Sequence, residues 1–151
     1  MRCLSRLLDR IFPVFEITDR RETSVYLRRR TLFWTPWLRI YLHQILRSDD
    51  DQCLHDHPWN FTSLILAGGY FEHLPRGGRR WRGPGSLIRH RAEDLHRVEL
   101  RLKNTPLGRR EQPALTLVVC GRKRRNWGFL TPDGWTYWRE HLEAQANENR
   151  D

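Results

Sequence analysis

Short runs of β-branched and aromatic residues, separated by Gly, Pro, Asp and Asn, follow one another along most of this chain from Phe12 onward. Such runs are typical of strands, because these side chains pack well on a pleated surface. So many short strands without long helices between them favour an all-β sandwich or jelly roll over an α/β fold. The expected strands are Val14–Ile17, Ser24–Leu32, Leu38–Ile45, Thr62–Ala67, Tyr70–Leu74, Ser86–Ile88, Leu95–Leu100, Ala114–Cys120 and Asn126–Leu130.

Glycine and proline mark the turns between these strands. Gly68-Gly69 predicts a hairpin, Pro75–Gly78 a second turn and Gly83-Pro84-Gly85 a third. Helix is expected only near the ends, over Ser5–Ile11 and over Asp133–Ala146, where apolar residues recur at helical spacing.

The 151 residues fit one domain, 1–151, with its core over about residues 38–130 and terminal extensions at 1–11 and 133–151. An aromatic content of 11% is enough to close a core. No run of about 18 apolar residues and no leader pattern is present, which predicts a cytoplasmic protein with no membrane association. The cysteines Cys3, Cys53 and Cys120 form no CxxC pair, so we expect reduced thiols.

The 27 basic and 18 acidic residues give a formal net charge of +9, which attracts polyanions. The basic residues fall in separate segments, as expected of solvated faces and turns. The charge therefore predicts weak, non-specific nucleic acid binding. A basic accessory protein that engages nucleic acid stays open as an alternative function.

The segment CLHDHPWN, residues 53–60, carries the most chemical information. Alternate side chains of an extended strand share a face, so His55 and His57 are expected to project together, about 7 Å apart along the chain. Imidazole suits several divalent transition metals, and two on one face begin a metal site. Asp56 points away from them by the same alternation, and we interpret it as a supporting residue rather than a ligand. A barrel mouth with polar histidines but no metal stays open.

A third histidine, His96, completes a pattern that resembles the cupin superfamily. The first cupin motif is G-x5-H-x-H-x(3,4)-E-x6-G. His55 and His57 match its paired histidines, and Gly68 matches its closing glycine. Phe61 stands where the family has a glutamate ligand.

The second cupin motif, G-x5-P-x-G-x2-H-x3-N, is matched in spacing from Gly85 to His96. Arg91 and Glu93 replace its proline and second glycine, and Leu100 replaces its asparagine. The first two replacements alter only a turn. The loss of the glutamate at Phe61 removes an anionic ligand and leaves three histidines.

The resemblance implies a single-domain cupin, a double-stranded β-helix or RmlC-like jelly roll, with His55, His57 and His96 as metal ligands. A site of three neutral histidines resembles that of cysteine-dioxygenase-like cupins, which hold Fe(II). This second resemblance implies that the protein is a metal-binding cupin and a non-haem Fe(II) dioxygenase acting on a small anionic substrate. Zn, Mn and Ni are the other candidate metals. The chain also resembles small bacterial and prophage-type cupins in four short motifs: HDHPW, LILxGGY, RxWGF and DGW. This third resemblance implies no particular reaction.

Other cupins bind a sugar-like or nucleotide-sugar-like ligand without catalysis, and this alternative stays open. The oligomeric state also stays open, with a homodimer as one candidate. The sequence names no substrate.

Candidate substrate-binding residues surround the two motifs. Arg89 and Arg97 flank the second motif, and a guanidinium binds carboxylate or phosphate in a bidentate manner. Tyr41 and His43 share a face of one expected strand and could line the same cavity. Trp59 follows the paired histidines and is expected to wall the site.

Two further residues are expected next to the histidines. Cys53 shares their expected face, as a small buried hydrophobic residue or a fourth ligand. Phe61 is expected to face the barrel interior and narrow the cavity. Three other histidines have no partner evident in the sequence: His73, His90 and His141.

Overall fold

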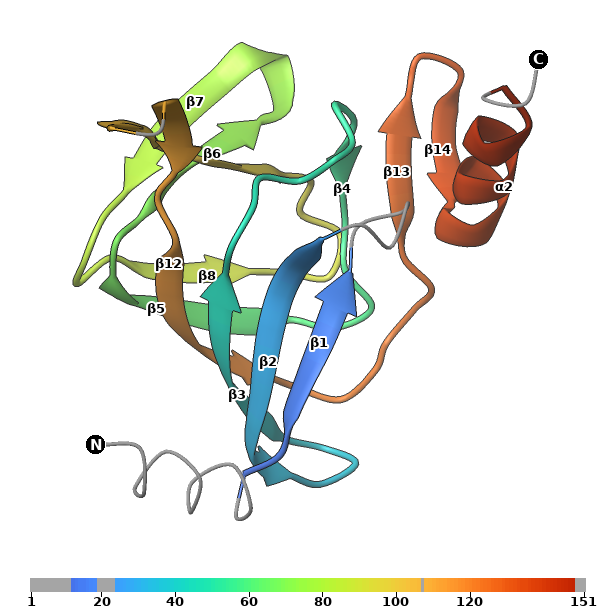
Figure 1. Ribbon diagram of the computed structural model, residues 1–151. Helices are drawn as coiled ribbons and strands as arrows, with labels where there is room; N and C mark the ends of the chain where they lie inside the picture. The colour runs from blue at the N-terminus through green and yellow to red at the C-terminus, as the bar shows by residue number, and fades with distance from the viewer. Residues whose placement is uncertain (1–11, 19–23, 107, 149–151) are drawn as a thin grey trace.

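The structure is a computed structural model that describes residues 12–18, 24–106 and 108–148 (Figure 1). The described residues form antiparallel strands, with one α-helix, α2 (Trp138–Glu148), near the C-terminal end. The expected helix Ser5–Ile11 lies outside the described residues. No helix in the described ranges is both long and apolar enough to span a membrane.

One layer of the fold is a six-stranded antiparallel sheet. In spatial order its strands are β1 (Val14–Thr18), β2 (Val25–Trp34), β3 (Arg39–Ile45), β12 (Ala114–Cys120), β5 (Phe61–Ala67) and β8 (Leu87–His90). Burial alternates along β12 and β8, as expected for strands with one face against a core.

The remaining strands form two three-stranded sheets and one short ribbon. The first sheet is β7 (Gly78–Arg82), β6 (Tyr70–Leu74) and β9 (Arg97–Leu100), with a 3₁₀ turn, η1 (Pro75–Gly77), between β6 and β7. The second sheet is β14 (Gly134–Tyr137), β13 (Gly128–Thr131) and β4 (Leu54–His55), and the ribbon is β10 (Leu102–Thr105) with β11 (Gly108–Glu111). An isolated bridge between His55 and His96 joins the two three-stranded sheets.

Two apolar clusters fill different ends of the interior. The larger one contains Ile45, Ile65 and Ala114, at one end of β3, β5 and β12. The smaller one contains Tyr41 and Cys120 near the other end of β3 and β12, with Phe61 and Trp59 packed against it.

The all-β prediction is confirmed, and each of the nine expected strands overlaps an observed one. Four observed strands, β7, β10, β11 and β14, were not expected, and β4 falls in the extended segment expected around His55 and His57 but ends at His55. β7, β10 and β11 are rich in Arg, Lys and Gly and present mostly exposed residues, so they lack the apolar alternation from which strands are predicted.

Two local predictions are wrong. Gly68-Gly69 does not form a hairpin, because β5 and β6 belong to different sheets; the pair turns the chain between them. Residues 134–137 are not helical but form β14, which pairs with β13 across a turn ending at Gly134, where φ is +117°. The Asp133-Gly134 pair is a hairpin signal that outweighs the helical spacing of the aromatic residues there.

The hairpin of β13 and β14 depends on close backbone contact at Gly128. A Cβ atom added there would lie 2.1 Å from the carbonyl oxygen of Thr136. We expect Gly128→Ala to lower the free energy of unfolding by about 1–3 kcal/mol, measured by urea denaturation. Gly121→Ala is the matched control, because its added Cβ would meet only the Asn60 oxygen at 3.7 Å. Equal stability of the two variants would contradict this packing.

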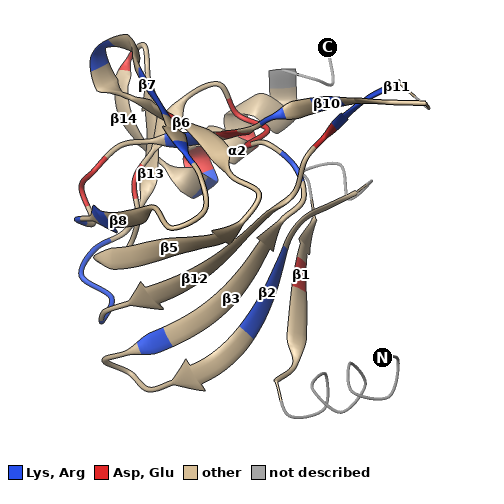
Figure 2. Cartoon of the chain, turned by 90° about the vertical axis from the view of Figure 1, so that its left-hand side faces the viewer, with Lys and Arg blue, Asp and Glu red and all other residues tan. Residues whose placement is uncertain are grey.

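The basic residues lie on several separate elements, including β2, β3 and the β6–β7 hairpin (Figure 2). This distribution agrees with the scattered pattern in the sequence. Nucleic acid binding stays a prediction.

Candidate metal centre

His55 and His96 lie side by side because their backbones pair directly. The amide of His55 donates to the carbonyl of His96 at 2.8 Å, and the amide of His96 donates back at 3.0 Å. Opposed residues of an antiparallel pair place their side chains on one side of the sheet. His57 follows two residues later, and its amide donates to the carbonyl of Ala92 at 2.9 Å.

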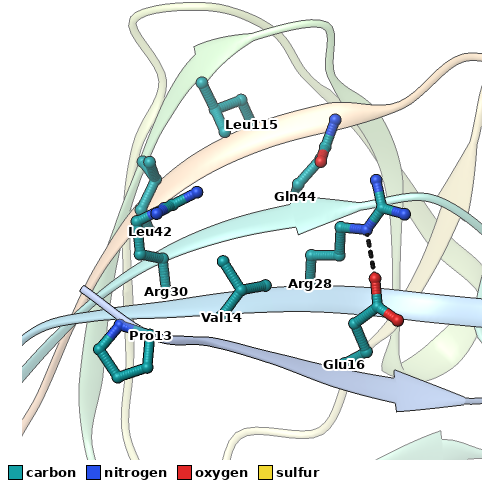
Figure 3. Close-up of a pocket in the computed structure, with 8 residues that line it drawn as sticks. All are labelled: Pro13, Val14, Glu16, Arg28, Arg30, Leu42, Gln44 and Leu115. Atoms are coloured by element: carbon teal, nitrogen blue, oxygen red, sulfur yellow. Dashed lines mark hydrogen bonds and ion pairs between the residues drawn. The ribbon is translucent and has the colours of Figure 1, made fainter. Parts of the chain in front are cut away.

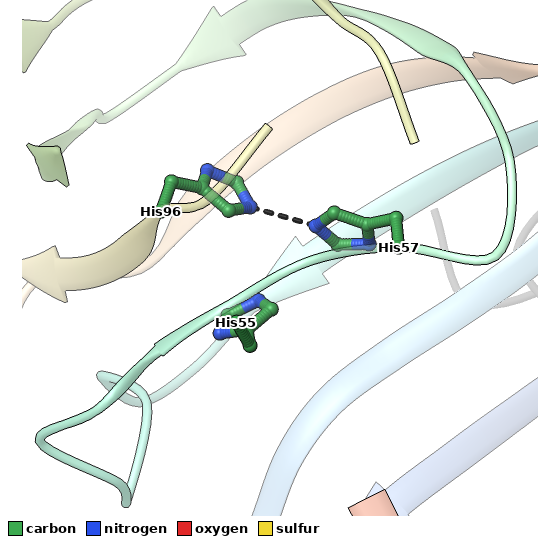
Figure 4. A group of neighbouring side chains, drawn as sticks. All are labelled: His55, His57 and His96. Atoms are coloured by element: carbon green, nitrogen blue, oxygen red, sulfur yellow. Dashed lines mark hydrogen bonds between the residues drawn. The ribbon is translucent and has the colours of Figure 1, made fainter. Parts of the chain in front are cut away.

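The three imidazoles converge as the sequence predicts. The ring centroids are 5.1 Å apart for His55 and His57, 5.0 Å for His55 and His96, and 4.9 Å for His57 and His96. Each ring offers a nitrogen that lies within 4.8 Å of the others. The Nε2 atoms of His57 and His96 point at each other across 2.7 Å (Figure 4). This arrangement fits one metal ion bound by three imidazoles.

Carboxylates lie behind two of the three rings. Nδ1 of His96 is 3.0 Å from Oε1 of Glu72, and Nδ1 of His55 is 3.7 Å from Oδ2 of Asp49. A carboxylate on Nδ1 fixes the proton there and leaves the lone pair of Nε2 for a metal. Metal-binding histidines in proteins commonly have such a partner, so the donor set fits a metal ion.

Glu72 is the centre of a buried ionic cluster. Its side chain is fully buried, and Arg82 Nε donates to Oε2 at 2.7 Å. Nε2 of His90 lies 2.7 Å from Oε1, although without the alignment of a hydrogen bond. Burial opposes ionisation of Glu72, but its interactions with the nearby His90, His96 and Arg82 side chains outweigh burial and hold its pKa well below the ordinary value. Glu72 is therefore a carboxylate.

Two of the three histidines, His55 and His57, are held in the neutral form. Burial, together with the neighbouring imidazoles of His96 and His55, lowers the pKa of His57 well below its ordinary value. Burial also lowers the pKa of His55 to about 4, against the opposing effect of Asp49. Neutral imidazole is the form that binds a metal, so no proton has to be displaced from the ring at neutral pH.

Phe61 packs against the site as expected. Its ring centroid is 4.7 Å from that of His57, edge to face, and 4.9 Å from that of His90, stacked. Phe129 lies on another side, 6.0 Å from the ring of His55. These rings give the candidate site an apolar wall.

Phe61→Glu is expected to tighten metal binding, because it places a carboxylate ligand beside the three histidines. The gain is best measured as the change in dissociation constant for Mn²⁺ or Zn²⁺ in a competition titration. Phe61→Gln has nearly the same size without the charge and is the matched control. An unchanged affinity in Phe61→Glu would mean that this position does not face the metal.

Asp56 has the supporting role expected of it. Its Oδ1 accepts from the amide of Gly128 at 2.7 Å, and its Oδ2 accepts from Trp135 Nε1 at 2.9 Å and lies 3.0 Å from Arg125 Nη1. These contacts tie the segment between His55 and His57 to the hairpin of β13 and β14. Asp56 is buried and is not a member of the three-histidine group.

The structure does not bring Arg89, Arg97 or Cys53 to the histidines. Arg89 is exposed and alternates with buried residues of β8, so it faces away from the interior. Arg97 likewise alternates with the buried residues of β9 and lies 3.7 Å from Glu99. Cys53 lies in a bend before β4, so strand alternation does not extend to it, and it gathers with Asp51 and His141.

The inner face of β2 and β3 carries two arginines that sequence reasoning did not select. Arg29 Nε donates to His43 Nε2 at 3.0 Å, and its guanidinium lies over the ring of Tyr41 at 4.9 Å. Arg39 lies over the ring of Trp59 at 5.1 Å. Burial and then Arg29 lower the pKa of His43 to about 3, so His43 is neutral.

A hollow of about 790 Å³ lies elsewhere, on the opposite face of this layer (Figure 3). Leu42, Gln44 and Leu115 line it, and these residues alternate with the buried ones of β3 and β12. Arg28 Nε donates to Glu16 at 2.7 Å at its edge. The hollow contains no histidine or cysteine and is separate from the candidate metal centre.

Sequence reasoning also missed Glu72, His90 and Asp49, which lie behind the three histidines. Glu72 alternates with exposed or half-buried neighbours in β6, and an acidic residue in a strand is ordinarily assigned to the solvent face.

No protein-family model and no curated protein matches this chain. Solved structures match it along most of its length. A cupin 2 conserved barrel domain protein from Rhodopseudomonas palustris has a TM-score of 0.61 and 15% identity, covering 82% of this chain and 80% of that chain. A cupin-2 domain protein from Rhodospirillum rubrum has a TM-score of 0.60 and 12% identity, covering 88% and 82%.

The Fe(II) form of HppE matches with a TM-score of 0.53 and 16% identity over 72% of this chain, which spans 56% of that chain. These identities support a shared fold and nothing finer. The chain therefore has the cupin double-stranded β-helix fold. Its histidines form a candidate metal site on that fold.

Proposed function

We propose that this protein is a metal-dependent cupin enzyme, a non-haem Fe(II) dioxygenase acting on a small anionic substrate. The observation that carries the proposal is the convergence of His55, His57 and His96, with carboxylates behind two of the rings. Imidazole ligands suit Fe(II), and also Zn, Mn and Ni. Fe(II) is preferred because the ligand set resembles that of cysteine-dioxygenase-like cupins.

His55, His57 and His96 would hold the Fe(II) ion, which when bound would supply the redox chemistry of dioxygenation. Glu72 holds the proton on Nδ1 of His96, so that the lone pair of Nε2 faces the centre. Oδ2 of Asp49 lies 3.7 Å from Nδ1 of His55, too far for a direct hydrogen bond, and contributes a negative charge on that side of the ring. The rings of Phe61 and Phe129 limit the access of water to the histidines.

The positions of Arg29 and Arg39 favour an anionic substrate in this proposal. Both side chains lie on the inner face of the six-stranded sheet, as their contacts with Tyr41 and Trp59 indicate. Nε of Arg39 is buried and has no hydrogen-bond partner among the described residues, so it is available to a carboxylate or phosphate. These two arginines replace Arg89 and Arg97 in our proposal, with Tyr41, His43 and Trp59 as pocket residues.

The activity is tested by O₂ uptake of the Fe(II)-loaded protein with small carboxylates that carry a thiol, hydroxyl or amine. We expect Fe(II)-dependent uptake with at least one class, and a KM raised more than about 10-fold in Arg39→Leu, because a charge-assisted hydrogen bond is lost. Arg89→Leu is the matched control and should keep the KM. Metal binding without O₂ uptake from any class would instead favour the non-catalytic cupin that binds a sugar-like ligand.

A further inference from the structure

A second group of metal-ligating side chains lies between the loop before β4 and helix α2. Asp51 and Cys53 belong to the loop, and His141 belongs to the helix. One ligand atom from each lies within 4.8 Å of the others. Asp51 and His141 are both 7% exposed, and Cys53 is half-buried. Gln145, one helical turn after His141, contacts the same atoms.

Three polar atoms in this group crowd one another. Asp51 Oδ2 is 2.5 Å from His141 Nε2 and 3.1 Å from Gln145 Nε2, and the two nitrogens are 3.0 Å apart. If Nε2 of His141 is protonated and donates to Asp51, then this N–H donor also lies beside the amide nitrogen of Gln145, which is itself a donor. If Nε2 is unprotonated, its lone pair faces the ionised carboxylate of Asp51. With Asp51 ionised, either tautomer of His141 therefore places two like groups together.

A cation at the centre of this group removes the conflict. The imidazole and the carboxylate then both direct lone pairs at the ion, and a turn of the Gln145 amide presents its oxygen instead of its nitrogen. Cys53 adds a thiolate on the remaining side. We propose that Asp51, Cys53, His141 and Gln145 form a second metal site, which takes Zn²⁺ as a structural ion.

The donor set selects the metal class. Sulfur, imidazole nitrogen and carboxylate oxygen are the ligands of tetrahedral Zn²⁺, and four protein donors make a closed, structural site. Ligand atoms around a tetrahedral zinc ion are about 3.3–3.8 Å apart, given bonds of about 2.0–2.3 Å. In the group the separations begin at 2.5 Å, between Asp51 Oδ2 and His141 Nε2, and stay within 4.8 Å, so zinc binding needs the crowded donors to move apart by about 1 Å.

The position of this site gives it a structural role. It joins α2 to the loop that leads directly into His55 and His57. The ring of His141 also packs on Phe129 of β13, with centroids 4.4 Å apart, and Phe129 in turn lies against His55. The ion would thus fix α2 and the β4 loop relative to each other, independently of any metal at the three histidines.

The test uses Co²⁺ as a probe for the full chain after metal removal with a chelator. Co²⁺ bound to a thiolate gives a charge-transfer absorption in the near ultraviolet. The three-histidine centre contains no sulfur ligand, so Co²⁺ bound there does not produce this band. We expect the band in the wild type and in His57→Ala, because the second site does not depend on the first. Zn²⁺ should displace Co²⁺, abolish the band and raise the Tm.

Cys53→Ser should lose the band and about one bound ion per chain, and Cys3→Ser is the matched control that keeps both. His141→Asn, with folding checked by circular dichroism, provides a second variant and should lose the same ion. Absence of the band at saturating Co²⁺, or its persistence in Cys53→Ser, would overturn the proposal. Neither result would affect metal binding at His55, His57 and His96.

Discussion

Replacement of Glu72 by alanine is expected to lower the free energy of unfolding by about 3–5 kcal/mol, the usual effect of removing one partner of a buried ion pair. The change leaves the guanidinium of Arg82, 2.6 Å from Glu72 Oε2 in the native protein, without its carboxylate. It also removes the carboxylate oxygen that is hydrogen-bonded to Nδ1 of His96 and lies 2.7 Å from Nε2 of His90. Urea denaturation of the metal-free protein measures the loss.

Two further variants serve as comparisons for the stability of Glu72→Ala. Arg80→Ala, at an exposed position of β7, is the control for charge removal and should change stability by less than about 0.5 kcal/mol. Glu72→Gln keeps the size and one acceptor oxygen, so its loss should lie between the two. A loss below about 1 kcal/mol in Glu72→Ala would show that the cluster of Glu72, Arg82, His90 and His96 does not stabilise the fold.

His57→Ala is expected to weaken binding of Fe(II), Mn²⁺ or Zn²⁺ at the candidate centre by more than about 100-fold. Loss of a residue that only supports a ligand already weakens metal binding about 10–100-fold, and His57 is proposed as a ligand itself. Competition with a chromophoric chelator measures the affinity, with Cys53→Ser as the background so that only one site is counted.

His73→Ala is the matched control, since His73 is also a half-buried histidine but pairs with Glu99 at 2.5 Å on another sheet. It should bind metal as the parent does. Equal affinity of His57→Ala and His73→Ala would contradict the assignment of His57 as a ligand.

The fold and the pair of His55 and His57 could be predicted because both depend on local patterns. Alternation of apolar residues predicts strands, and a two-residue spacing places His55 and His57 on one face. His96 requires a long-range pairing, and only the resemblance in motif spacing brought it to the other two. The backbone bridge between His55 and His96 is the physical basis of that pairing.

Glu72, Arg29 and Arg39 could not be predicted from local patterns, because their roles depend on which strands face each other. Glu72 stands opposite Val98 in the pairing of β6 with β9, which brings it behind His96. Arg89 and Arg97 were chosen for closeness in sequence to His96, yet strand alternation turns both away from the interior. Short strands shift their register by one residue easily, and a shift of one residue exchanges the two faces.

Cytoplasmic location, a homodimer and weak nucleic acid binding stay predictions. All three concern surfaces and surroundings rather than the interior of the barrel. The interior is the part of the molecule to which we assign function.

The most direct test of the metal centre is anomalous scattering from crystals of the protein loaded with Fe(II) or Mn²⁺. We predict one peak within about 2.0–2.2 Å of an imidazole nitrogen from each of His55, His57 and His96, with the Nδ1 atom of His96 still bonded to Glu72. A loaded crystal with no peak among these three rings, or with His96 turned away from the metal, would contradict the account.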